Sequence, residues 1–148
     1  MKSIGKVIDT FSADINSKGL PRPKVDSLEL KAGYGIINDK FAGKELHKTV
    51  MIVGINSYKL ALDNDISMEH GSLGENILLD FNPHDFEIGT IFKIGNSEIE
   101  ITEKCTICNH LSVFHKKLPK LLRQCRGLYC KILNDGIIEK DANVSIKD

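Results

Sequence analysis

The chain has 148 residues, with 20 basic and 20 acidic side chains and four cysteines. This length buries enough apolar surface for one domain, residues 1–148, to fold without a metal ion or a disulfide. The zero net charge argues against a nucleic-acid partner, because nucleic-acid-binding domains usually carry a basic excess.

The N-terminal residues alternate between polar and apolar types and lack the continuous apolar stretch of a signal peptide. No stretch of the sequence has the length and apolar character needed to cross a bilayer. We therefore expect a cytoplasmic protein with no membrane partner. Thiols stay reduced in that compartment, so the cysteines indicate metal, redox or catalytic groups before they indicate disulfides.

In chain order, the apolar residues mostly follow a period of two, which predicts half-buried strands. The expected strands cover residues 4–9, 25–30, 49–54, 76–79, 90–94, 98–102, 128–133 and 143–146. Gly95-Asn96 predicts a hairpin between the fifth and sixth of these strands, and Asp135-Gly136 predicts one that joins residues 131–133 to 137–138.

Helical signals are fewer. Ser57 is expected to cap a short helix that runs through residues 60–62, and a second helix is expected from Ser112 through Leu118, interrupted by Pro119. Many short strands with few helices predict a mainly β fold, either a barrel or a sandwich, with one or two covering helices.

Residues 104–134 contain all four cysteines, seven basic residues and no acidic residue. The remaining 117 residues hold 13 bases and 20 acids, so the neutral total combines a segment of +7 with a remainder of −7. Neighbouring positive charge lowers the pKa of a thiol and so favours the reactive thiolate. The segment therefore predicts a site for an anion or for sulfur chemistry.

The cysteine spacing leaves several interpretations open. Cys105 and Cys108 have the gap of a thiol redox pair or of half a zinc site, whereas Cys125 and Cys130 lie four residues apart. Together the four predict a zinc-binding or thiol-sensing module, with His110 and His115 as alternative ligands. Cys130 lies within an expected strand, which favours a small buried side chain instead.

Two further segments carry polar groups that can bind a ligand. Residues 70–76 place two glycines before Glu75 and Asn76, so the backbone can turn sharply and approach a bound group. Residues 123–129 place Arg126 before a glycine and a strand, an arrangement that suits a bidentate grip on a phosphate or carboxylate. For each segment the alternative is a purely structural loop or a solvated edge.

Taken in order, these segments resemble the MOSC domain, the module named after the C-terminal part of molybdenum cofactor sulfurase. The resemblance lies in five motifs spread from about Gly33 to the C-terminus: the glycine loop with Glu75-Asn76, residues 87–95, the strand 100–102 leading to Cys108, residues 126–129 and residues 134–141.

This resemblance implies a MOSC-like β-barrel and a molybdenum (molybdopterin) cofactor. It also implies that Cys108 carries sulfur as a persulfide or meets the molybdenum centre. The resulting site has Cys108 as the catalytic residue and no residue assigned as a metal ligand. The expected cofactor-binding residues are Gly74, Glu75, Asn76, Lys104, Arg123 and Arg126.

The activity expected from the resemblance is sulfur transfer to the cofactor, or a component of a molybdenum-dependent reductase of N-hydroxylated compounds. The chain is too short for the pyridoxal-phosphate half of the sulfurase. The implied partner is therefore a cysteine desulfurase-type sulfur donor, a molybdoenzyme or a redox protein. An accessory subunit that only docks to a partner remains a further alternative.

The chain departs from the family pattern at several positions. Cys105 replaces the basic residue that usually stands three before the family cysteine, and Ile107 replaces a proline. Lys40-Phe41 follows Asn38-Asp39 where Gly-Asp and then a histidine are common. From its spacing, Cys105 can resolve an oxidised Cys108 by forming a disulfide with it, and no role is assigned to Cys125.

Overall fold

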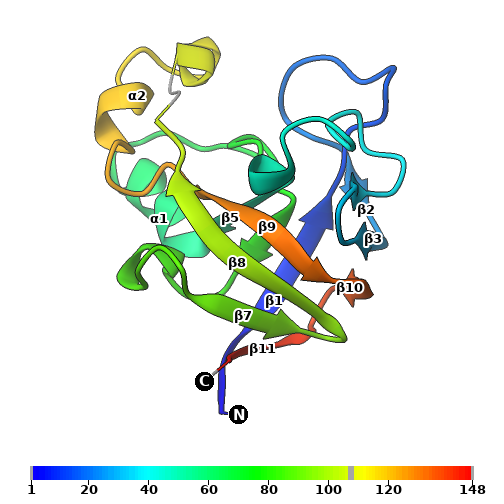
Figure 1. The fold of residues 1–148 in the computed structure, drawn as a ribbon. Helices are drawn as coiled ribbons and strands as arrows, with labels where there is room; N and C mark the ends of the chain where they lie inside the picture. Colours follow the sequence, from blue (N-terminus) through cyan, green and yellow to red (C-terminus); the bar gives the residue numbers. More distant parts are fainter. Residues whose placement is uncertain (1, 107–108, 148) are drawn as a thin grey trace.

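Seven strands of the described chain close into a β-barrel (Figure 1). The structure is a computed structural model that describes residues 2–106 and 109–147. Around the barrel the strands are β1 (Ser3–Phe11), β11 (Asn143–Ile146), β7 (Ile91–Ile94), β8 (Ser97–Lys104), β9 (Leu128–Asn134), β5 (Val50–Gly54) and β6 (Ile77–Leu79). β1 pairs with both β6 and β11, which closes the ring and satisfies its edges. The predicted mainly β fold is thus confirmed as a barrel.

A small second sheet lies beside the barrel. It consists of β3 (Ser27–Lys31), β4 (Gly35–Ile36) and β10 (Gly136–Glu139), whereas β2 (Lys24–Val25) pairs with the end of β1. The strand predicted over residues 25–30 therefore divides at Asp26 into two strands with different partners.

The hairpin predicted at Gly95-Asn96 is confirmed, but the one predicted at Asp135-Gly136 is wrong. β10 pairs with β3 and not with β9. A single residue separates β9 from β10, too few for a two-residue hairpin loop. The Asp135 carboxylate instead accepts a hydrogen bond of 2.7 Å from the Ala32 N–H, which ties the corner to the small sheet.

The helices α1 (Ile55–Asp63) and α2 (Leu118–Leu121) lie on one side of the barrel (Figure 1). The 3-10 turns are η1 (Leu46–Lys48), η2 (Pro83–Asp85) and η3 (Asn109–Val113). Ser57 is not the cap of α1, as predicted, because the helix begins two residues earlier and the buried Ser57 hydroxyl donates to the Cys125 carbonyl oxygen. The second predicted helix is split into η3 and α2, with Pro119 in the first turn of α2, where the absence of its N–H is tolerated.

Two apolar cores follow from the strand pattern. Val50 and Ile52 on one face of β5 join a core to which all seven barrel strands contribute, so this core fills the interior. Met51 and Val53 on the opposite face join a second core with α1, η3 and α2. β5 is buried along its whole length, which explains its continuous apolar run.

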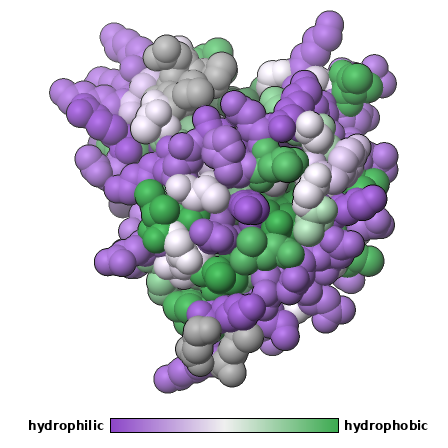
Figure 2. All heavy atoms as spheres, viewed as in Figure 1, coloured by the Kyte–Doolittle hydropathy of each residue, from purple (hydrophilic) through white to green (hydrophobic). Residues whose placement is uncertain are grey.

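Figure 2 shows a largely hydrophilic surface, with hydrophobic residues gathered across the middle of this face. Among the described helices, none combines the length and the apolar character of a transmembrane span.

Candidate functional site

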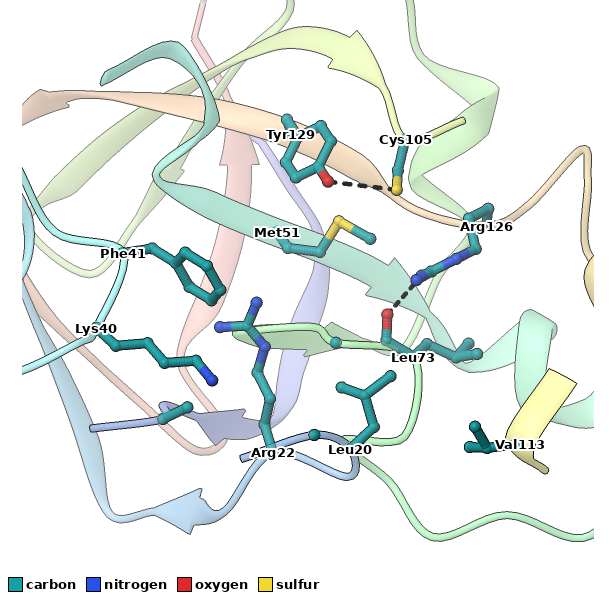
Figure 3. Close-up of a pocket in the computed structure, with 13 residues that line it drawn as sticks. Leu20, Arg22, Lys40, Phe41, Met51, Leu73, Cys105, Val113, Arg126 and Tyr129 are labelled. Atoms are coloured by element: carbon teal, nitrogen blue, oxygen red, sulfur yellow. Dashed lines mark hydrogen bonds between the residues drawn. The ribbon is translucent and has the colours of Figure 1, made fainter. Parts of the chain in front are cut away.

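A cavity of about 520 Å³ lies against the outer face of β5 and the start of β9 (Figure 3). Its polar lining includes the side chains of Arg22, Lys40 and Arg126, and no described lining residue is acidic. Its apolar lining includes Leu20, Met51 and Leu73. We call it the arginine cavity. A pocket of this size, cationic and partly apolar, fits a small anionic molecule.

Arg126 is placed in the cavity by the turn that opens β9. Its side chain is 4% exposed and its guanidinium donates a hydrogen bond to the Leu73 carbonyl oxygen. The next residue, Gly127, has φ of +138° and lets the chain turn directly after Arg126. A Cβ at position 127 would lie 2.4 Å from the Met51 side chain. Position 127 must therefore be glycine, and this glycine allows the preceding Arg126 to place its guanidinium in the cavity.

Arg22 and Lys40 approach the cavity from two loops and meet at the ring of Phe41 (Figure 3). The Arg22 guanidinium lies 5.0 Å and the Lys40 ammonium 5.4 Å from the ring centroid. Burial lowers the pKa of Arg22, and the Asp39 carboxylate, 3.8 Å away, opposes that shift. Arg22 stays charged, since a guanidinium does not lose its proton in proteins.

Cys105 and Tyr129 form a hydrogen-bonded pair on the cavity wall. The Cys105 thiol lies 3.4 Å from the Tyr129 hydroxyl oxygen. Burial and this contact raise the pKa of Tyr129, whereas Arg126 and Arg22 act in the opposite direction. The phenol therefore keeps its proton at neutral pH and can serve as a hydrogen-bond donor.

The structure divides the predicted glycine-loop residues between the cavity and the interior. Gly74 lines the cavity with φ of +82°. Glu75 is completely buried behind it and accepts a hydrogen bond of 2.6 Å from the Tyr58 hydroxyl. Asn76 is 2% exposed and joins the Met51 N–H to the Phe11 carbonyl oxygen. Glu75 supports the loop through the Gly71 N–H, whereas Asn76 joins the neighbouring strands. Their predicted part in cofactor binding stays a prediction.

Two predicted basic residues point elsewhere. Lys104 is exposed at the end of β8, and Arg123 is exposed after α2; neither lines the cavity. Lys104 instead lies close enough to His84 to reinforce the lowering of the His84 pKa, which burial dominates.

Cys108 lies outside the described residues, as does the side chain of His110. Of the described cysteines, Cys130 is buried in the barrel interior, as predicted, and Cys125 packs in the outer core. Burial also raises the pKa of the Cys130 thiol. Within residues 2–106 and 109–147, no three histidine, cysteine or acidic side chains gather as a metal site requires.

Sequence reasoning did not assign Arg22, Lys40 and Tyr129 to the site. Arg22 stands between Pro21 and Pro23, and this fixed backbone around a basic residue is a signal that the sequence did contain. Lys40 lies in the segment that departs from the family pattern. Neither position could be linked to Arg126 without knowing how the loops meet.

Comparisons with known proteins agree with this architecture. The family profile described as "MOSC domain" matches residues 38–145. A search of curated proteins found no significant match. Among solved structures, the YUAD protein from Bacillus subtilis has a TM-score of 0.79 and 16% identity over 96% of this chain and 94% of its own.

Two YiiM structures are also similar. YiiM from Geobacillus stearothermophilus has a TM-score of 0.70 and 16% identity, covering 99% of this chain and 75% of its own. YiiM from Escherichia coli has a TM-score of 0.68 and 15% identity, covering 97% and 70%. At these identities the likeness establishes the fold.

Proposed function

The chain belongs to the MOSC domain family, and from this membership we propose that it binds a molybdenum cofactor of the molybdopterin type in the arginine cavity and handles sulfur through Cys108. The observation that carries the proposal is the cavity itself, which is lined by three cationic side chains and by no described acidic one.

The donor set fits the phosphate of such a cofactor. Arg22 and Arg126 offer planar guanidinium groups that can grip phosphate oxygens with two hydrogen bonds, and Lys40 adds a point charge. Because both guanidinium groups are largely buried, an anion held there is screened little by solvent. When bound, the cofactor supplies a molybdenum centre that accepts sulfur ligands and exchanges electrons.

The other lining residues orient the ligand and exclude water. Met51 and Leu73 present apolar surface between the arginines, and the protonated Tyr129 hydroxyl can donate to an acceptor on the ligand (Figure 3). Cys105 places a thiol at this wall, three residues before Cys108 in the chain.

The proposed sulfur chemistry is an exchange between persulfides. The Cys108 thiolate attacks the outer sulfur of a donor protein's persulfide, the S–S bond of the donor breaks, and the donor leaves as a thiolate. Cys108 then holds the outer sulfur as a persulfide and passes it on to an acceptor. A cysteine desulfurase-type protein is the proposed donor, and the cytoplasm, where thiols stay reduced, is the proposed location.

Cofactor binding can be tested by producing the protein in a host that synthesises molybdenum cofactor. We expect pterin, measured as its fluorescent oxidation product, and molybdenum to copurify with the protein. Lys40→Met should lower the occupancy about tenfold, the effect expected for one charged phosphate contact. Lys44→Met is the matched control, because Lys44 also lies near the Phe41 ring, at 5.9 Å, but does not line the cavity. If the wild type, Lys40→Met and Lys44→Met are all purified without pterin and molybdenum, the proposal is contradicted.

Sulfur carrying can be tested by intact mass of freshly purified protein before and after reductant. We expect added sulfur that reductant removes, that disappears in Cys108→Ala and that persists in Cys125→Ala. Added sulfur that survives in Cys108→Ala would assign the carrier to another thiol. One zinc per chain in the same preparations would favour the zinc-binding alternative.

A further inference from the structure

The loop of residues 71–74 contacts both arginines of the cavity. The Arg22 backbone N–H donates to the Gly71 carbonyl oxygen at 3.0 Å, and the Arg126 guanidinium donates to the Leu73 carbonyl oxygen. A Cβ at Gly74 would lie 3.8 Å from the Arg22 Nε, so the Arg22 side chain passes directly beside the loop. Together with Asp39 and Phe41, which contact the Arg22 guanidinium, this loop therefore helps to position both arginines.

Glycine makes this loop dependent on contacts from outside it. Gly71 has φ of +93° and Gly74 has φ of +82°, a region that glycine occupies without strain but does not by itself prefer over others. Within the loop the Gly74 N–H donates to the Gly71 carbonyl oxygen at 3.1 Å, and further support comes from side chains that contact the loop. The side chains that bind the loop from below therefore contribute to the positions of Arg22 and Arg126.

Two buried side chains bind the loop from below. The Tyr58 hydroxyl oxygen accepts hydrogen bonds from the N–H groups of Gly71 at 3.1 Å and Leu73 at 3.3 Å, and it donates to Glu75 Oε2 at 2.6 Å. Glu75 Oε2 also accepts from the Gly71 N–H at 3.2 Å. The peptide units that these N–H groups belong to lie next to the carbonyl groups that hold the arginines.

Glu75 also influences the charge of the cavity. It is completely buried, and no described residue donates to its Oε1. Burial raises the pKa of Glu75. The hydrogen bonds from Tyr58 of α1 and from backbone N–H groups, together with the electrostatic effect of His70, act to lower it. The group also acts electrostatically on Arg22. Since an ionised Glu75 offsets positive charge that an anion needs, the unionised form favours anion binding.

We propose that Glu75 and Tyr58 are positioning residues, which hold loop 71–74 so that Arg22 and Arg126 converge on one bound anion. The inference rests on the proposed function in taking the cavity as an anion site, but the geometry it concerns exists in the protein alone. Glu75 thereby acts on the ligand through the arginines and not by direct contact.

Sulfate binding to the purified protein, followed by calorimetry, tests this assignment, because sulfate keeps its charge throughout the titration range. Tyr58→Phe and Glu75→Leu should each weaken sulfate binding about tenfold, since one charge-assisted contact is misplaced. Glu75→Gln retains an acceptor for Tyr58 and Gly71 and should bind within about threefold of the wild type.

A pH series separates positioning from general damage. Wild-type affinity for sulfate should fall as pH rises and Glu75 ionises, whereas the affinity of Glu75→Gln should lack that decrease. Ser97→Ala is the matched control. It removes a part-buried hydrogen bond, from the Ser97 hydroxyl to the Asn134 carbonyl oxygen at 2.9 Å, between two residues that do not line the cavity. Its sulfate affinity should equal that of the wild type.

The side-chain NMR signal of Arg126, assigned with Arg126→Lys, provides a readout without any ligand. It should shift in Tyr58→Phe and stay in place in Ser97→Ala. An unchanged signal together with unchanged sulfate affinity in Tyr58→Phe would overturn the positioning assignment. A shifted signal in a protein that binds no sulfate would support positioning and overturn the anion site.

Discussion

Asn76 joins strands on both sides of β6 through one side-chain amide. It accepts from the Met51 N–H of β5 at 2.9 Å and donates to the Phe11 carbonyl oxygen of β1 at 3.1 Å. The Asn76 backbone also bonds to both strands, because its N–H donates to the Met51 carbonyl oxygen and its carbonyl oxygen accepts from the Phe11 N–H. At the residue scale, an amide that sequence analysis assigned to cofactor binding therefore has a structural task at the start of the strand after the glycine loop.

Replacing Asn76 with leucine should destabilise the fold strongly. Two buried backbone groups would lose their partners, and each loss costs about 1–3 kcal/mol. We expect a decrease of about 2–4 kcal/mol in the free energy of unfolding, measured by urea denaturation. Asn64→Leu is the control, because the Asn64 amide donates to the Leu60 carbonyl oxygen at an exposed position. Equal stabilities for the two variants would contradict the structural assignment.

At the scale of elements, loops 71–74 and 126–127 decide the shape of the cavity. Both contain glycines with positive φ next to a residue that lines it. Gly71 has a second constraint, because a Cβ there would lie 2.6 Å from the Arg22 carbonyl oxygen and 3.0 Å from the Phe11 ring. Backbone cannot move aside as a flexible side chain can, so this position excludes any larger residue.

Comparing two glycine-to-alanine changes isolates this steric effect. Gly71 and Gly89 have similar φ, +93° and +98°, but a Cβ at Gly89 would meet no atom within 4 Å. Gly89→Ala should therefore cost only the backbone strain, about 1–2 kcal/mol. Gly71→Ala should cost about 3 kcal/mol or more, because strain and overpacking add. Chemical denaturation measures both, and equal losses would show that loop 71–74 can relax.

At the scale of the whole molecule, folding redistributes the charge pattern of the sequence. Of the seven basic residues in the acid-free segment 104–134, only Arg126 lines the cavity. The other two cavity cations, Arg22 and Lys40, come from the part of the chain that carries the acidic excess. The cavity field is therefore a product of tertiary structure and not of the local run of lysines and arginines.

Burial of Glu75 should also give the whole protein a pH-dependent stability. Its folded pKa is raised, so its contribution is complete below the unfolded value of about 4.3 and is lost as pH rises through the folded pKa. Glu75→Gln removes this titration. Its stability relative to the wild type should therefore increase with pH in urea denaturation. A constant difference would contradict burial of an ionisable Glu75.

Sequence pattern alone predicted the barrel strands, the Gly95-Asn96 turn and the buried character of Cys130, and it placed Gly74 and Arg126 in loops. These features depend on local rules, namely alternation along a strand, glycine at positive φ and arginine before a turn. The family resemblance came from the same local motifs. The family profile matches residues 38–145, a range that contains all five motifs.

Long-range packing, and not sequence spacing, brings together the residues that share the cavity. Arg22, Lys40 and Arg126 lie on three segments far apart in the sequence, and nothing in their spacing predicts that they converge. The same holds for the pairing of β10 with β3, where a one-residue corner overrides the hairpin signal. It also holds for Glu75, whose side chain is buried beneath the loop and does not line the cavity. In each case long-range packing selected one of several conformations that the local sequence allowed.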